Sequence, residues 1–167
     1  MLDDYGVPDD IREKVNNLLG EDPHSWVLVL EGEKPVSWNT IWSSPHWTER
    51  KNIADAIQVI VAKARGEIDP EIEPPPLPVD ITFVAYQKNR TKKGKTMPLV
   101  DCDNLLAKPY IDALKGWWIR DDDPTCVRSV RLYSMVDNEQ PRLEIILTPV
   151  PGAKPWEAKV DYAQETD

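Results

Sequence analysis

Side chains that could hydrolyse a phosphodiester bond are concentrated in one stretch of the chain. Asp101 and Asp103 lie two residues apart, so on an extended segment both carboxylates point to the same side. Lys108 and the acidic triplet 121–123 follow. Carboxylate oxygens suit hard cations such as Mg²⁺ or Mn²⁺, and a lysine ammonium can stabilise charge on a phosphate under attack. The spacing therefore predicts a metal-dependent phosphodiesterase site, with a third carboxylate supplied by the triplet.

Simpler interpretations of the same residues stay open at this point. An Asp-x-Asp-Asn sequence before a helix can be an N-cap with acids favoured by the helix dipole. A run of three aspartates is usually a solvated turn, and most helix lysines are solvated. An EF-hand is excluded, because Leu105 and Leu106 stand where it needs an oxygen ligand and a glycine.

Charge is distributed unevenly along the 167 residues. The net charge of −9 argues against a polyanionic partner when it is taken alone. Residues 81–120, however, hold eight basic and three acidic side chains, a net +5, and leave −14 on the remainder. Five of these basic residues fall in one predicted loop: Lys88, Arg90, Lys92, Lys93 and Lys95. This loop is the best candidate for DNA contact, and the alternative is a flexible, solvated hairpin.

The length favours a single domain. We expect this domain at residues 26–150, with a helical extension at 1–25 and an acidic tail at 151–167. Two cysteines are too few for a disulfide framework, which indicates a reducing cytoplasm. We expect neither a signal peptide nor a membrane span, because the sequence has no suitable apolar run.

Hydrophobic periodicity predicts the elements that must position these side chains. Helices are expected at residues 8–19, 48–65 and 104–115, the last interrupted by Pro109. Strands are expected at 26–30, 81–86, 127–134 and 143–147, with an acidic, proline-rich linker at 67–80 and a loop at 87–97. This order predicts an α+β fold, a small mixed sheet of about four strands packed with two or three helices. A glycine-rich phosphate loop is absent from the sequence.

The segment from Asp101 to Asp122 resembles the signature of the RusA family of Holliday junction resolvases. That signature is Asp-x-Asp-Asn, a Lys, an Asp-Ala-Leu and an Asp-Asp pair about ten residues later, and this chain has Asp112 in the Asp-Ala-Leu. Residues 37–39 (Ser-Trp-Asn) resemble the family's N-terminal Ser-x-Asn, and residues 142–145 resemble its closing strand. The resemblance covers roughly residues 26–149 and predicts a RusA-like fold.

The resemblance implies a Mg²⁺-dependent endodeoxyribonuclease that acts as a homodimer in DNA recombination and repair. It would cut four-way DNA junctions by paired nicks, since a two-fold dimer matches the symmetry of the junction arms. Carried over by position, Asp101, Asp103 and Asp122 would be the metal-binding carboxylates and Lys108 the essential lysine. The family also suggests a phage or prophage origin.

The chain departs from the family pattern in its spacing. Lys108 lies five residues after Asp103, where the family has four, and Pro109 follows it. We therefore expect a π-bulge or a helix restart here, because in a regular helix one extra residue would turn Lys108 by about 100°. The third aspartate leaves Asp122 and Asp123 as alternative ligands. A displaced lysine would instead give a non-catalytic DNA-branch binding protein, and the Glu-x-Lys at residues 157–159 is a minor alternative nuclease motif.

Overall fold

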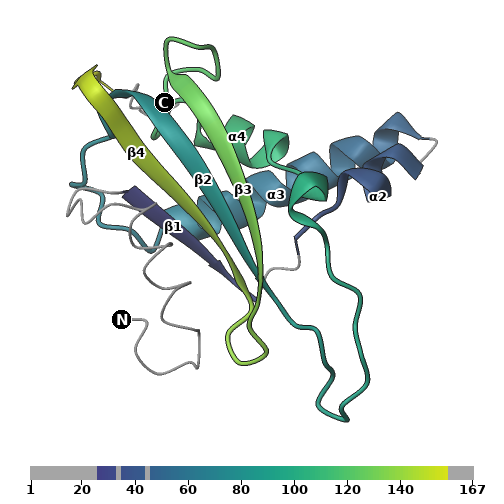
Figure 1. The fold of residues 1–167 in the computed structure, drawn as a ribbon. Coiled ribbons are helices and arrows are strands. Elements are labelled where there is room, and N and C mark those ends of the chain that lie inside the picture. The colour runs from purple at the N-terminus through teal and green to yellow at the C-terminus, as the bar shows by residue number, and fades with distance from the viewer. Residues whose placement is uncertain (1–25, 33–34, 44–45, 158–167) are drawn as a thin grey trace, which may run out of the picture.

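The computed structural model describes residues 26–32, 35–43 and 46–157. In these residues the chain forms a four-stranded sheet in the order β1-β4-β2-β3 (Figure 1). Strand β4 (Arg142–Lys154) pairs antiparallel with both β1 (Trp26–Glu31) and β2 (Leu77–Gln87), whereas β2 pairs parallel with β3 (Val127–Val136). This mixed sheet confirms the predicted α+β fold.

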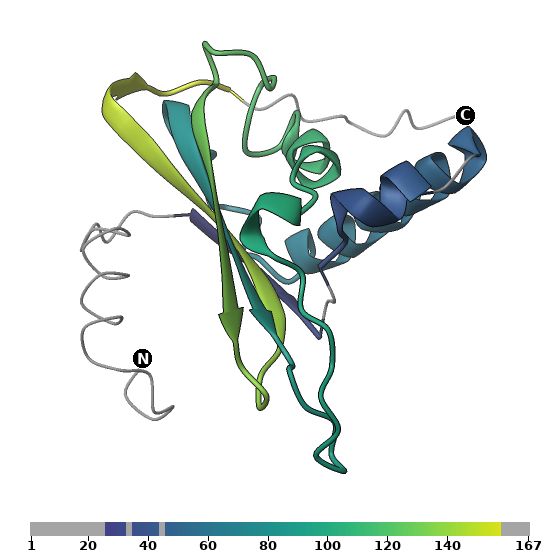
Figure 2. The same cartoon turned by 45° about the vertical axis from the view of Figure 1, so that its right-hand side comes forward.

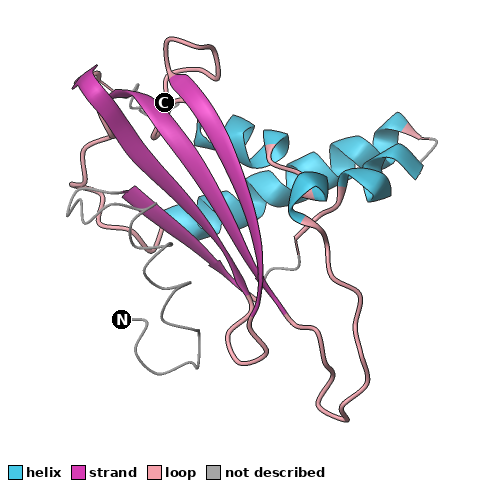
Figure 3. Cartoon of the chain, in the orientation of Figure 1, coloured by secondary structure: helices cyan, strands magenta, loops and turns pink. Residues whose placement is uncertain are grey.

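The helices within the described residues cover one face of this sheet (Figures 2 and 3). They are α2 (Trp38–Ser43), α3 (Trp47–Arg65) and α4 (Lys108–Leu114), with a short 3₁₀ turn, η1, at Cys102–Asn104. None of these helices is long and apolar enough to cross a membrane.

The core lies between the sheet and these helices. Strand side chains alternate between the two faces, so Ile81 and Phe83 of β2 point toward the helices, whereas Val84 points to the opposite face. Ile57 and Val61 of α3 pack against the inner face, and both are buried. Burial of each such side chain contributes about 1.5–3 kcal/mol, which fixes α3 and α4 on the sheet.

Several predicted elements are confirmed and others need correction. Strand β1 and helix α3 lie where periodicity placed them, and α3 ends at Gly66. Strand β2 begins at Leu77, so the last part of the expected linker 67–80 is strand, and β4 continues to Lys154, past residue 150. These two extensions pair with each other, since Leu77 lies opposite Lys154. The predicted helix at 8–19 lies outside the described residues.

The residues that follow β4 also contact the body of the protein. Trp156 packs against the core, and its indole N–H donates a hydrogen bond to the carbonyl of Pro75 at 3.1 Å. The expected tail therefore begins with residues that pair and pack, at least as far as Trp156. The sequence hid this because residues 149–155 include three prolines and show no alternation.

The connection from β2 to β3 determines where the site lies. These strands are parallel neighbours, so residues 88–126 must cross from one end of the sheet to the other. The crossing places η1 and α4 on the helical face. Apart from the minor alternative motif at 157–159, every residue that the sequence nominated for metal, catalysis or DNA contact is on this single connection.

Candidate active site

Helix α4 starts at Lys108, not at residue 104 as predicted. After η1 the chain is extended at Leu105, which forms a bridge with Ser37, and the N–H of Leu106 donates to the carbonyl of Val36 at 2.9 Å. Both leucines are buried, so packing and pairing interrupt the helical pattern. Pro109 then occupies the first turn of α4, where a missing N–H costs nothing. The helix restart is confirmed, and the extra residue is accommodated before the helix begins.

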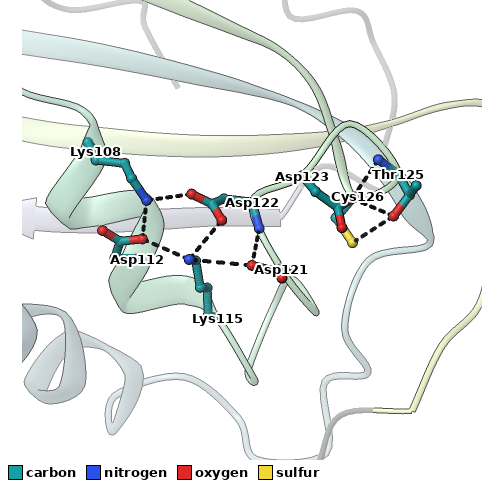
Figure 4. A network of polar contacts seen from close by, with 8 residues as sticks. All are labelled: Lys108, Asp112, Lys115, Asp121, Asp122, Asp123, Thr125 and Cys126. Carbon is teal, nitrogen blue, oxygen red and sulfur yellow. Dashed lines mark hydrogen bonds and ion pairs between the residues drawn. The ribbon is translucent and has the colours of Figure 1, made fainter.

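Two lysines and two aspartates form a closed ring of alternating charges, which we call the charge ring: Lys108, Asp112, Lys115 and Asp122 (Figure 4). The Lys108 ammonium contacts Oδ1 of Asp112 at 2.5 Å and also Oδ2 of Asp122. The Lys115 ammonium contacts Oδ1 of Asp112 at 3.0 Å and Oδ1 of Asp122 at 2.8 Å. Both carboxylate oxygens of Asp122 therefore accept from lysines.

Local structure explains why these four residues meet. Asp112 follows Lys108 by four residues, so the two side chains share one face of α4. Gly116 has a φ of +75°, a conformation that glycine adopts without strain, and it turns the chain out of the helix. Trp118 and Ile119 are then buried in the core and return the chain toward α4. This turn brings the aspartate triplet back to the helix.

The ring fixes the charge state of its members. Hydrogen bonds from Lys108 and Lys115 hold the pKa of Asp122 well below its usual range. Burial raises the pKa of Asp112, but hydrogen bonds from the same lysines outweigh it and leave that pKa lowered. The carboxylates of Asp112 and Asp122 raise the pKa of Lys108, and those of Asp122 and Asp112 raise that of Lys115. Near neutral pH Lys108 is therefore a cation and not a proton acceptor.

Asp101 immediately precedes η1 and Asp103 lies within it, and both side chains are exposed. Asp101 is at the N-cap position but makes no capping hydrogen bond, and α4 has Ala107 at its own N-cap, so the helix-cap interpretation is wrong. Within the part of the chain that the structure describes, neither carboxylate has a hydrogen bond or ion pair. Both are therefore open to solvent and to a ligand.

The predicted metal ligands match a hard cation in chemistry but not in position. Three aspartates are the oxygen donors that Mg²⁺ or Mn²⁺ prefers. In residues 26–32, 35–43 and 46–157, however, no three His, Cys, Asp or Glu side chains lie close enough together to hold a metal ion. Asp101 and Asp103 are free of partners there, whereas Asp122 is bound to two ammonium groups. The donor set does not form a metal site in this arrangement.

The neighbour of Asp122 has a different role. Oδ1 of Asp123 accepts from the backbone N–H of Thr125 at 2.7 Å and from its hydroxyl at 2.5 Å. The hydroxyl and backbone bonds from Thr125 lower the pKa of Asp123. Asp123 thus closes the turn before β3, while Asp122 faces Lys108. The alternative motif at 157–159 has only Glu157 in the described part, where it is exposed.

The basic loop forms one wall of an open cavity of about 550 Å³ at the end of the sheet. Three of its predicted DNA-contact residues, Lys88, Arg90 and Lys92, line the cavity together with Met97, Asn138 and Glu139. Lys93 and Lys95 are exposed on the same loop, outside the lining. The cavity therefore offers cations and hydrogen-bond donors to a phosphate backbone.

Asn138 holds the two walls of this cavity together. Its Oδ1 accepts from the backbone N–H groups of Asn89 and Arg90, each at 3.1 Å, and its Nδ2 donates to Oδ1 of Asn89 at 2.9 Å. The sequence analysis missed both Asn138 and Lys115. The four-residue spacing of Lys108 and Asp112 was a usable signal for the helical half of the ring, but no local pattern marks Asn138.

A mixed sheet presents carboxylates and lysines on one crossover connection, and the same connection begins with a basic loop that lines a cavity. This combination suits a small α+β nuclease. A model of the endodeoxyribonuclease RusA family matches residues 42–148, from α2 into β4, and includes every predicted site residue. The chain therefore belongs to the RusA endodeoxyribonuclease family. RusA resolvases generally depend on a divalent metal. A search of curated proteins gave no significant match.

Proposed function

We propose that this protein is a Mg²⁺-dependent endodeoxyribonuclease that resolves Holliday junctions by paired, symmetric nicks. Membership of the RusA family supports the reaction class. The contact between Lys108 and Asp122 is the observation that carries the proposal. One extra residue separates Lys108 from Asp103, yet α4 begins at Lys108 and the Lys108 ammonium contacts Asp122, the proposed third ligand.

In this proposal the exposed carboxylates of Asp101 and Asp103 are metal ligands, with Asp122 as the third once it is released from the charge ring. Mg²⁺ is the expected ion and Mn²⁺ the alternative. Lys108 remains protonated and supplies positive charge to the phosphate that is attacked. Its raised pKa supports this electrostatic role, since a neutral amine would be rare at physiological pH.

The basic loop is the proposed DNA contact of the site. Lys88, Arg90 and Lys92 would bind phosphates along the open cavity, and Lys93 and Lys95 would extend that surface. Such contacts release counterions, so binding should weaken steeply with salt despite the acidic pI. The two-fold symmetry of a four-way junction favours a homodimer with one site per protomer. We place this activity in DNA recombination and repair in the cytoplasm of a phage-infected or prophage-carrying cell.

Cleavage of a mobile four-way junction tests the proposal. Purified protein with Mg²⁺ should give symmetric nicks, and Asp103→Asn should abolish them while junction binding persists. Asp55→Asn is the matched control, because Asp55 is an exposed aspartate on α3 and is not part of the crossover connection. Cleavage should be unchanged in this control. Absence of nicking by the wild type with either Mg²⁺ or Mn²⁺ would refute the nuclease proposal.

A second candidate, a non-catalytic DNA-branch binding protein, is supported by the engagement of both oxygens of Asp122 with lysines. It predicts tight junction binding without nicks under any divalent ion. Deleting Ala107, which restores the family spacing, would then leave the protein inactive. Nicking by the wild type would exclude this alternative.

A further inference from the structure

Lys115 is the member of the charge ring with the most acidic neighbours. Its ammonium contacts Oδ1 of Asp112 at 3.0 Å, Oδ1 of Asp122 at 2.8 Å and Oδ1 of Asp121 at 3.4 Å. The family signature that the chain resembles contains one lysine, and Lys115 is a second one that immediately follows its Asp-Ala-Leu. Lys115 therefore gives the site one positive charge more than the residues of the family signature would give it.

The two lysines contact both carboxylate oxygens of Asp122. Lys108 bonds one oxygen and Lys115 bonds the other, so a cation that bound either oxygen would have to share it with an ammonium group (Figure 4). A divalent ion that approached Asp122 would also be repelled by the two ammonium groups that contact this carboxylate. A divalent ion therefore competes with both ammonium groups for Asp122.

Lys115 lies outside the regular helix, unlike Lys108. It is just beyond the last residue of α4, at the helix C-cap, and Gly116 follows it. Its long stem can therefore carry the ammonium into solvent without disturbing the helix, although its side chain is 33% exposed against 51% for Lys108. Both lysines also pair with Asp112, Lys108 at the favourable four-residue spacing and Lys115 at a three-residue spacing.

We propose that Lys115 is a positioning residue that competes with a divalent cation for Asp122, so that Asp122 becomes a ligand only when Lys115 is displaced. The inference rests on the proposed function, because it takes Asp122 as a metal ligand. In the described residues Asp122 is held by lysines, whereas Asp101 and Asp103 are unpaired, so Asp122 is the one proposed ligand for which a cation must compete. It also gives Lys115 a role separate from that of Lys108.

Direct Mn²⁺ binding to the full-length protein, followed by the loss of the free-ion EPR signal, tests this inference without any cleavage. Lys115→Met should bind Mn²⁺ about three- to tenfold more tightly than the wild type, as expected when about two exposed ion pairs no longer compete. Lys115→Arg keeps the charge and should bind like the wild type. Lys63→Met, an exposed lysine in the last turn of α3, is the matched control and should also be unchanged.

A double-mutant comparison shows whether the effect passes through Asp122. Asp122→Asn should weaken Mn²⁺ binding, and adding Lys115→Met to it should give no further gain. Unchanged or weaker Mn²⁺ binding by Lys115→Met overturns the inference, and so does an equal gain in the presence of Asp122→Asn. If the wild type nonetheless cleaves junctions, the nuclease proposal survives that failure. If neither the wild type nor Lys115→Met binds Mn²⁺, and no cleavage occurs, both fail.

Discussion

The proposed DNA-contact loop can be tested through a residue that carries no charge. Asn138 lies after β3, and its side chain makes three hydrogen bonds to Asn89 and Arg90 at the start of the loop. The substitution Asn138→Ala removes all three bonds and leaves every lysine and arginine in place. It therefore separates the ordering of the loop from its charge.

The expected magnitude follows from these bonds. A hydrogen bond contributes about 0.5–1.5 kcal/mol net, and the lower value applies here because water can replace the partners of exposed groups. The three bonds together favour the ordered loop by about 1.5 kcal/mol. In the variant, this free-energy cost of ordering the loop is subtracted from the free energy of binding. Since about 1.4 kcal/mol is a tenfold change, the Kd for a four-way junction should rise about tenfold.

Fluorescence anisotropy of a labelled junction, without divalent ions and at several salt concentrations, measures this change. The slope of log K against log salt should stay the same in Asn138→Ala, because no phosphate contact loses its cation. Arg90→Gln should instead reduce the slope by about 0.9. Hydrogen exchange of the amides of Asn89 and Arg90 should also be faster in Asn138→Ala.

Gln140→Ala is the matched control, since Gln140 is an amide in the same turn whose side chain makes no hydrogen bond within the described residues. It should bind the junction like the wild type. If Asn138→Ala has the same affinity and exchange rates as this control, the three bonds do not order the loop. If it lowers the salt slope, the loss arises from altered phosphate contacts, and the reasoning from pre-organisation is refuted.

Three further predictions concern the scaffold of the site. Asp80 is buried and accepts two hydrogen bonds from Arg128, so Asp80→Asn should lower the free energy of unfolding by about 1–3 kcal/mol at pH 7. The hydrogen bond from Arg128 lowers the pKa of Asp80 in the folded protein. The stabilisation that ionised Asp80 contributes is therefore complete above about pH 4 and is lost as the pH falls through the folded pKa. Urea unfolding of Asp80→Asn should not show this loss of stability in acid. Gly116→Ala forces a side chain into a φ of +75° with no neighbour within 4 Å, so thermal unfolding should show a loss of about 1–2 kcal/mol from backbone strain alone. The buried indole N–H of Trp118 has no hydrogen-bond partner in the described chain. In urea denaturation, Trp118→Phe should therefore change the free energy of unfolding by less than about 1 kcal/mol. Trp118→Ala should instead lower it by about 3–5 kcal/mol.

Much of the scaffold was predictable because its signals are local. The apolar run at residues 26–30 and the amphipathic repeat at 48–65 gave β1 and α3 almost to the residue. Spacing also indicated Lys108 and the triplet 121–123 as site candidates, and the resemblance to the RusA family singled out Asp122; in the structure Lys108 contacts Asp122. Local pattern therefore identified the strands and the main helix.

What the sequence did not reveal depends on contacts between distant segments. The helix predicted from residue 104 is interrupted because Leu106 bonds to the backbone of Val36, about seventy residues earlier. The strand extensions at Leu77 and Lys154 exist because they pair with each other. Asn138 acts on a loop that begins almost fifty residues before it. Periodicity within a short window carries no information on such partners.

The crossover between β2 and β3 has a consequence for how this site can vary. Residues 88–126 start and end on adjacent strands, so the sheet constrains the two ends of this segment but not its length. The entropic cost of closing a connection rises only slowly with its length, so one inserted residue costs little. The extra residue before Lys108 was absorbed this way, ahead of the helix that fixes the lysine. Insertions between Leu106 and Lys108, after the buried and paired leucines, should be tolerated, whereas those between Lys108 and Asp112 would rotate one lysine out of the ring.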